Sequence, residues 1–444
     1  MHNGHNSCRQ QAYQPQRRHG FAALTVVMIL FFVMAMVAAY TNRNLIFEQR
    51  IATNSYRANR ALEAADAGVE WTVALLNGGR INANCQPSNT VTDTDFRRRY
   101  QTDAPIGVTG EGGYDHIWAD VGNNRIYPAC VNREGVLSCI CPTLGVAAPA
   151  IGGVADGLGS AFRVEFLRPG NAVRPGAIAF AARGCASVGT GAGACTSQRH
   201  VALPTVDGLS GALTTVGLVR ALPISPIAAL TAGSTISGTA LSISNTDAAT
   251  GLAAHAASAP APAAGVVYRG PAGSSVSPWL ADSALTDLRA EANDGWFRKM
   301  FGMDPATYRR QPAVRLVDCT NGCTSASLTN VVQGYPRNPI WVPGNLDLDT
   351  AGALGSAADP VMLIVAGQLT ISANVVITGF VHADSIVWAA GAAGASVRGA
   401  MVARDTFAAA SLATLDYDRA VLDLISLRYG SFVRAPGSWN LIIL

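Results

Sequence analysis

The sequence predicts an α+β protein in which a long N-terminal helix precedes a β-rich exported body. Three observations support this fold class. Residues 21–40 carry no charge, residues 41–76 continue without proline, and the C-terminal third alternates apolar with small or polar residues. The alternation predicts a parallel β-solenoid-like sheet near the C-terminus.

The first predicted element is a membrane-spanning helix at residues 21–40. Half of these residues are Phe, Leu, Ile or Val, each favouring insertion at mid-bilayer by roughly 0.3–0.6 kcal/mol. Twenty residues at about 1.5 Å each match the ~30 Å hydrocarbon core. A cleaved secretory signal, with Val37-Ala38-Ala39 as its cleavage site, is one alternative, although the apolar run is long for one. A plain uncleaved anchor is another.

The same helix is expected to continue to Leu76 as an amphipathic segment. Apolar or small residues recur mostly every three or four positions, as on one helix face. They are Phe47, Ile51, Ala58, Leu62, Ala65, Val69, Val73 and Leu76. Gly78-Gly79 end the helix. The junction Arg17-Arg18-His19-Gly20-Phe21 places an unhindered glycine between a basic leader and the apolar run.

Three segments together resemble the type IV pilin family, and specifically its PilX-type branch. They are Arg17-Arg18-His19-Gly20-Phe21-Ala22-Ala23-Leu24, Glu48-Gln49-Arg50-Ile51-Ala52-Thr53-Asn54 and Arg60-Ala61-Leu62-Glu63-Ala64-Ala65-Asp66-Ala67-Gly68. The resemblance covers residues 17–76. It implies that prepilin peptidase cuts after Gly20 and methylates the amine of Phe21. Thr25 departs from the family, which mostly carries Glu at this fifth mature position.

The resemblance also implies a function, partners and a location. The expected function is that of a minor pilin in type IV pilus assembly, which primes or caps the fibre near its tip. The expected partners are prepilin peptidase, major and minor pilins and a tip adhesin. The body would be periplasmic at the bacterial inner membrane and then part of the extracellular fibre. A subunit of a type II secretion pseudopilus is one alternative. A membrane-anchored surface-binding protein or hydrolase with a pilin-like helix is another.

The predicted organisation has four parts. They are a leader (1–20), the helix (21–79), a cysteine-containing β-rich region with an Ala/Gly/Ser-rich loop (80–275), and a short helical segment followed by a repeat-like β region (276–444). Strand-like runs stand at 161–166, 177–182 and 200–203, weak alternation at 228–244, and a flexible loop at 253–264. Residues 282–303 are predicted to be helical, with aromatic residues that favour a core over a binding site.

The C-terminal repeat places small residues every six positions, at Gly367, Ala373, Gly379 and Ser385. The apolar pairs between them would each be buried by stacking on the next unit. An ordinary antiparallel sheet would show the same alternation, so that alternative stays open.

The cysteines favour disulfides in an exported body. After loss of Cys8, eight remain: Cys85, Cys130, Cys139, Cys141, Cys185, Cys195, Cys319 and Cys323. Cys185–Cys195 and Cys319–Cys323 are the expected local pairs. The other four allow three pairings, of which those without a Cys139–Cys141 link are favoured. Thiolate metal ligation is the alternative, but no histidine stands at a zinc-motif spacing.

The sequence contains no recognised catalytic motif, and we expect no catalytic residue, no metal and no cofactor. Asn345, Asp347 and Asp349 share alternate positions but lack the glycine and terminal glutamate of an EF-hand. A solvated strand or turn accounts better for them, and also for Asp416 and Asp418. A net charge of +3 without a Lys/Arg stripe gives no sign of nucleic-acid binding.

Overall fold

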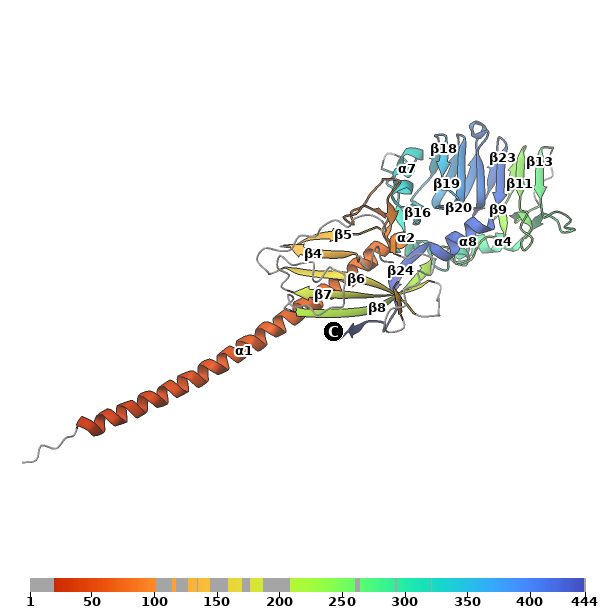
Figure 1. Ribbon diagram of the computed structural model, residues 1–444. Coiled ribbons are helices and arrows are strands. Elements are labelled where there is room, and N and C mark those ends of the chain that lie inside the picture. The colour runs from red at the N-terminus through yellow and green to blue at the C-terminus, as the bar shows by residue number, and fades with distance from the viewer. Residues whose placement is uncertain are drawn as a thin grey trace, which may run out of the picture. The chain divides into compact units, whose positions relative to one another are not determined.

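The computed structural model describes residues 20–100, 114–116, 127–133, 135–143, 159–169, 176–186, 208–259, 264–291, 294–320 and 322–442. The chain divides into two compact units, Met1–Tyr56 and Arg57–Leu444. The first described element, α1 (Gly20–Leu76), is a single helix of 57 residues that runs through both units. The long N-terminal helix and the β-rich body are thereby confirmed (Figure 1).

An antiparallel sheet forms the first part of the body unit. Its order is β24-β8-β7-β6-β4-β5, with β25 also on β8 and β3 on β6. These strands are β3 (Tyr114–His116), β4 (Ala129–Arg133), β5 (Val136–Ile140), β6 (Ser160–Pro169), β7 (Ala177–Ala186), β8 (Gly208–Arg220), β24 (Gly430–Arg434) and β25 (Asn440–Ile442). The expected strands at 161–166 and 177–182 are present and antiparallel. The run at 200–203 lies outside the described residues.

The end of α1 packs on one face of this sheet. Ala61, Ala65, Val69 and Leu76 are all fully buried and follow the three-to-four spacing of one helix face. The helix and the sheet come close together because glycines lie at their contact. A Cβ on Gly68 would meet the ring of Phe162 at 2.9 Å. Small residues on the helix therefore let its backbone lie directly against the sheet.

Three short elements link α1 to this sheet. They are β1 (Arg80–Ile81), β2 (Thr94–Asp95) and α2 (Phe96–Tyr100), and β1 pairs with β2 antiparallel. Trp71 of α1 contacts the rings of Phe96 and Phe162 edge-on at centroid distances of 5.6 Å and 5.5 Å. These aromatic side chains extend the core between the helix, α2 and the sheet.

The second sheet contains 15 strands, and every described pairing within it is parallel. Its strands are β9 (Ala228–Ala232), β10 (Ile236–Gly238), β11 (Leu241–Ser244), β12 (Leu252–Ala256), β13 (Val266–Arg269), β14 (Trp279–Ala281), β15 (Arg315–Leu316), β16 (Pro339–Val342), β17 (Leu346–Leu348), β18 (Gly352–Leu354), β19 (Val361–Ile371), β20 (Val375–Trp388), β21 (Ser396–Ala403), β22 (Phe407–Ala409) and β23 (Ala413–Tyr417). Parallel pairing decides against an ordinary antiparallel sheet.

The strand register shows how the six-residue repeat is used. Val361 pairs with Gly379, eighteen residues later, so three six-residue units separate stacked positions. Each six-residue unit therefore stacks on the unit three repeats further along the chain and not on the next one. Gly379 stands where a Cβ would come 1.9 Å from the carbonyl oxygen of Val361. The close stacking of backbones explains the small residue there. The solenoid itself stays a prediction.

The stacking order departs from the chain order. One inward ladder runs through neighbouring strands as Ile340, Leu363, Val381, Met401, Leu230, Ala254 and Trp279. Strands from residues 228–281 therefore stack on the C-terminal strands, while β24 and β25 return to the antiparallel sheet. The sheets do not follow the division expected at residues 275 and 276.

The helices of the body are mostly short. They are α4 (Ala284–Ala290), α5 (Gly295–Phe301), α6 (Pro305–Tyr308), α7 (Ser325–Gly334), α8 (Arg419–Arg428) and the 3-10 turn η1 (Ala390–Ala392). The helical prediction for residues 282–303 corresponds to α4 and α5. Phe297 and Phe301 of α5 are buried against Trp341, Ile364 and Phe380, so the aromatic residues are core.

The flexible loop predicted at residues 253–264 is wrong in its first part. Residues 252–256 form β12, paired in parallel with β9 and β14. Ala253, Ala254 and Ala256 are buried. Their small side chains fit inside the stacked sheet, so alanine content that suggested a loop belongs to a core strand.

Candidate functional site

The apolar end of α1 is the first candidate site. Its span Ala22–Leu76 is long and apolar enough to cross a membrane, and its most apolar stretch is wholly unburied. Large side chains such as Met28, Phe31 and Phe32 are exposed. Surface of this kind is suited to lipid or to neighbouring apolar helices.

The predicted processing residues lie at the start of this helix. Gly20 and Phe21 are the first residues of α1. Thr25 donates a hydrogen bond from its hydroxyl to the carbonyl oxygen of Ala22 at 3.0 Å. This local bond satisfies the hydroxyl within the helix, as is usual for threonine in apolar helices.

The cysteines form disulfides within the body. Cys130 is bonded to Cys139 across the β4–β5 pair, and Cys85 is bonded to Cys141. Cys319 is bonded to Cys323. Cys185 is disulfide-bonded as well, whereas Cys195 lies outside the described residues. The pairing of the first four is one of those that avoid a Cys139–Cys141 link.

The candidate calcium residues have other partners. The Asn345 side-chain oxygen accepts from the Gln368 amide at 2.9 Å, and an Asp347 carboxylate oxygen accepts from the Ser372 hydroxyl at 2.5 Å. Asp349 accepts from the Ser325 amide at 3.3 Å. Among the described residues no group of three or more His, Cys, Asp or Glu side chains is arranged to hold a metal.

Three consecutive arginines of α2 form a junction that was not predicted from the sequence. Arg97 is buried and donates to the carbonyl oxygens of Leu76, Arg428 and Gly430. Its guanidinium also lies 4.7 Å from the ring centroid of Phe432. Burial lowers the pKa of Arg97 to about 10, so it stays charged at neutral pH. Arg97 thus joins the end of α1 to α8 and β24.

The two neighbouring arginines contact other parts of the body. Arg98 bonds Asp95 at 2.8 Å and Asp359 at 2.9 Å. Burial disfavours the charged form of Asp95, but Arg98 outweighs it and the pKa of Asp95 is lowered. Arg99 donates to the carbonyl oxygens of Ile81 and Cys141. The sequence feature that could have indicated this junction is the run Arg97-Arg98-Arg99 in a chain with only 14% charged residues.

Asn77 makes a second joint at the end of α1. Its side-chain amide donates to the Phe432 carbonyl at 2.9 Å and accepts from the Phe432 amide at 2.8 Å. Its own carbonyl oxygen accepts from Asn338 at 3.1 Å. One residue therefore ties the helix end to β24 and to the segment that precedes β16.

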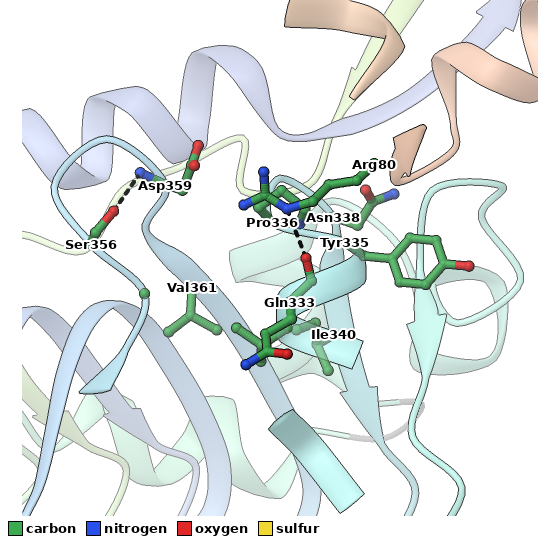
Figure 2. A pocket seen from close by; sticks show the side chains of 11 residues that line it. Arg80, Gln333, Tyr335, Pro336, Asn338, Ile340, Ser356, Asp359 and Val361 are labelled. Carbon is green, nitrogen blue, oxygen red and sulfur yellow. Dashed lines mark hydrogen bonds between the residues drawn. The ribbon is translucent and has the colours of Figure 1, made fainter. Parts of the chain in front are cut away.

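A cavity of about 170 Å³ lies beside this junction (Figure 2). Arg80 and Asp359 are its charged lining residues. Arg80 donates to the Gln333 carbonyl at 2.9 Å, and Asp359 bonds Arg98 and Arg337. Because Arg80 is already hydrogen-bonded to backbone carbonyl groups and Asp359 is already ion-paired, we interpret the cavity as part of the junction and not as a ligand site.

The apolar helix and the disulfide-bonded β body are features of a membrane-anchored protein with an exported domain. A family model described as PilX N-terminal matches residues 19–70. Residues 19–70 are therefore similar to the N-terminal region of PilX-type pilins, and the match falls on the segments that carry the sequence resemblance. No curated protein matches the chain.

One solved structure that aligns with this chain is the competence-associated pilin ComZ from Thermus thermophilus. The alignment has 10% identity and a TM-score of 0.20, and it covers 87% of this chain and 98% of that chain. This score is too low to support an argument about fold or function.

Proposed function

We propose that this protein is a structural minor pilin that takes part in type IV pilus assembly and is not an enzyme. The PilX N-terminal match to residues 19–70 is the observation that carries the proposal. Before assembly, the apolar part of α1 would sit in the bacterial inner membrane with the body in the periplasm. In the fibre it would pack against the corresponding helices of other pilins.

The proposal includes processing at Gly20. Prepilin peptidase would cut after Gly20 and methylate the new amine of Phe21. Intact mass of the membrane-extracted protein is expected to correspond to a chain that begins at Phe21. Gly20→Val is expected to block the cut, because a branched side chain crowds the peptide bond. Ala22→Val adds similar bulk two residues later and serves as the control.

A mature chain that begins at Met1 or Tyr40 would contradict the proposal. The first result would indicate an uncleaved anchor, and the second a secretory signal. A chain that begins at Phe21 but never appears in sheared fibres would point to a secretion pseudopilus.

We further propose that the subunit lies near the fibre tip, beside other minor pilins and a tip adhesin. Thr25 offers a hydroxyl but no countercharge for the amine of a neighbouring subunit. An unpaired charge is costly in an apolar helix bundle. A subunit with nothing beyond it escapes that requirement. Quantitative mass spectrometry of sheared fibres is expected to find far fewer copies than of the major pilin. Near-equal abundance would rule out tip placement.

A further inference from the structure

The Cys319–Cys323 disulfide differs from the other described disulfides in its exposure. Both of its cysteines are partly exposed. In each of the other two bonds whose partners the structure describes, at least one cysteine is fully buried. Cys141, bonded to Cys85, and Cys130, bonded to Cys139, are both 0% exposed. Within the described part of the chain, Cys319–Cys323 is therefore the bond with both cysteines at the surface.

This exposure determines how easily each bond can be opened. A disulfide opens when a thiolate attacks one sulfur and the other sulfur leaves as a thiolate. At Cys130 or Cys141, either the attack or the released charge would have to lie inside the apolar core, where a charge is costly. At Cys319–Cys323 either sulfur can be attacked and the other released toward water. Thiol–disulfide exchange should therefore select this bond.

The turn that contains this bond is also held by hydrogen bonds. The Gly322 amide donates to the Cys319 carbonyl at 2.9 Å, and the Asp347 amide donates to the Cys323 carbonyl at 3.0 Å. The next residue, Thr324, forms a parallel bridge with Asp347. The disulfide spans only four positions, so it removes little conformational freedom from the unfolded chain. Opening of the bond should therefore leave the surrounding fold in place.

The charged groups beside this bond limit which thiol can react. Asp318 directly precedes Cys319, and Asp347 is hydrogen-bonded to Cys323. Arg315 lies four positions before Cys319, but its guanidinium donates to a backbone carbonyl just after α1. A small anionic thiol such as glutathione is repelled by the two carboxylates, whereas a thiol in neutral or basic surroundings is not.

We propose that the Cys319–Cys323 bond is a reversible redox site, opened and re-formed by exchange with a protein dithiol in neutral or basic surroundings. One thiolate of the dithiol protein attacks a sulfur of the bond. This step forms a mixed disulfide and releases the other cysteine as a thiolate, which takes up a proton. The second thiolate of the dithiol protein then attacks its own sulfur in the mixed disulfide and releases the remaining cysteine.

The exchange balances without a further reagent. Two electrons and two protons pass to Cys319 and Cys323, and the dithiol protein is oxidised to a disulfide. The reverse reaction closes the bond again. This inference does not depend on the role in pilus assembly, since it rests only on the geometry of the body.

Selective reduction of the purified full-length protein in detergent tests the difference between the bonds. Dithiothreitol is added under native conditions, acid stops the reaction at intervals, and alkylation with mass spectrometry locates the free thiols. We expect Cys319 and Cys323 to be labelled at least about tenfold faster than Cys85 and Cys141. Equal or slower labelling of Cys319 and Cys323 would overturn the proposal. In the control variant Cys319→Ala/Cys323→Ala, labelling of Cys85 and Cys141 should stay as slow as before.

Acid quenching of cells that contain the full-length protein tests whether the exchange occurs there. Free thiols receive a light alkylating label, and thiols released later by reduction receive a heavy one. We expect about a tenth or more of Cys319 and Cys323 to carry the light label, against about a hundredth or less of Cys85 and Cys141. Complete heavy labelling of Cys319 and Cys323 would overturn the proposal.

A single substitution tests for the dithiol protein itself. Cys323→Ser leaves the Cys319 thiol free to form a mixed disulfide, which should appear as a reductant-sensitive adduct with a different protein. Cys319→Ser/Cys323→Ser is the control and should form none. The absence of an adduct in Cys323→Ser, or an adduct with a second copy of this chain alone, would contradict the proposal.

Asp318→Asn tests the charge preference. The substitution removes one carboxylate with little change in size, so glutathione should open the bond about twofold faster. The rate with dithiothreitol, which is uncharged, should stay unchanged. An equal rise with both reagents would overturn the charge preference, because it would indicate a change in the turn and not in its charge.

Discussion

His382 is buried within β20 against the aromatic side chains of α5. Its ring lies 5.6 Å from that of Phe297 and 5.4 Å from that of Phe301. In the part of the chain that the structure describes, neither ring nitrogen has a hydrogen-bond partner. Burial, followed by the charge of Arg404, lowers the pKa of His382 to about 3.

This shift predicts a pH dependence of stability. The unfolded state binds a proton near pH 6.5, whereas the folded state resists it until about pH 3, so acidification between these values favours unfolding. From pH 7 to pH 5 the protein should lose about 2 kcal/mol through this group. His382→Leu should remove that loss, and urea unfolding of both proteins at each pH measures it. Equal losses in the two proteins would contradict the assignment.

Residue-level interactions were the least predictable from sequence. The buried positions Ala65, Val69 and Leu76 of the helix face follow from spacing alone, because neighbours in sequence determine them, whereas the buried Ala61 was not among the predicted positions. The acceptors of Arg97 lie at Arg428 and Gly430, more than three hundred positions away, so no local pattern specifies them. The three arginines could be noticed, but not the carbonyl groups they bind.

At the scale of elements, the contact of α1 with the antiparallel sheet depends on Gly184. A Cβ there would lie 2.0 Å from the Ala61 carbonyl oxygen and 2.4 Å from the Ala65 amide nitrogen. Both partners are helix backbone and cannot rotate away. The helix and β7 therefore meet at a distance that only glycine permits.

Gly184→Ala should destabilise the body by about 1–3 kcal/mol, the range for overpacked cores. Gly217→Ala in β8 is the matched control, because a Cβ at Gly217 meets nothing within 4 Å. Urea unfolding followed by tryptophan fluorescence distinguishes the two variants. Equal urea midpoints for the two variants would show that the helix can move away from β7 without loss of stability.

The element predictions succeeded where periodicity was strong. An unbroken apolar and amphipathic pattern defined α1 to within one residue at its start and gave Leu76 as its end. Alternation identified β6 and β7. Residues 252–256 were misassigned because alanine carries no clear preference for strand or loop, and burial in the stacked sheet decided the outcome.

At the scale of the whole molecule, disulfides close loops of very different length. Cys85–Cys141 spans 56 positions, whereas Cys319–Cys323 spans four. A longer closed loop removes more conformational freedom from the unfolded chain. The two bonds should therefore differ in their contribution to stability.

Replacement of Cys85 and Cys141 by alanine should cost about 4 kcal/mol, and that of Cys319 and Cys323 about 2 kcal/mol. Thermal unfolding of the two double variants without reductant gives the comparison. A larger loss for the Cys319–Cys323 variant would mean that this bond acts mainly by holding the segment before α7.

The whole-molecule arrangement was only partly accessible from sequence. The repeat at Gly367, Ala373 and Gly379 indicated short stacked strands, but its stacking partners lie three units apart. Nothing in residues 228–281 reveals that they join strands near residue 400. That choice depends on long-range packing, which a periodic pattern does not encode.

The pairing of Leu230 with Met401 has a consequence for how the chain matures. Synthesis proceeds from the N-terminus, so β9 must wait for some 170 further residues before its neighbour β21 exists. β8 likewise waits for β24. Late closure of such distant contacts slows folding and leaves apolar strands uncovered in the interim. Both sheets would therefore be completed only after the C-terminal strands β21 and β24 have been made.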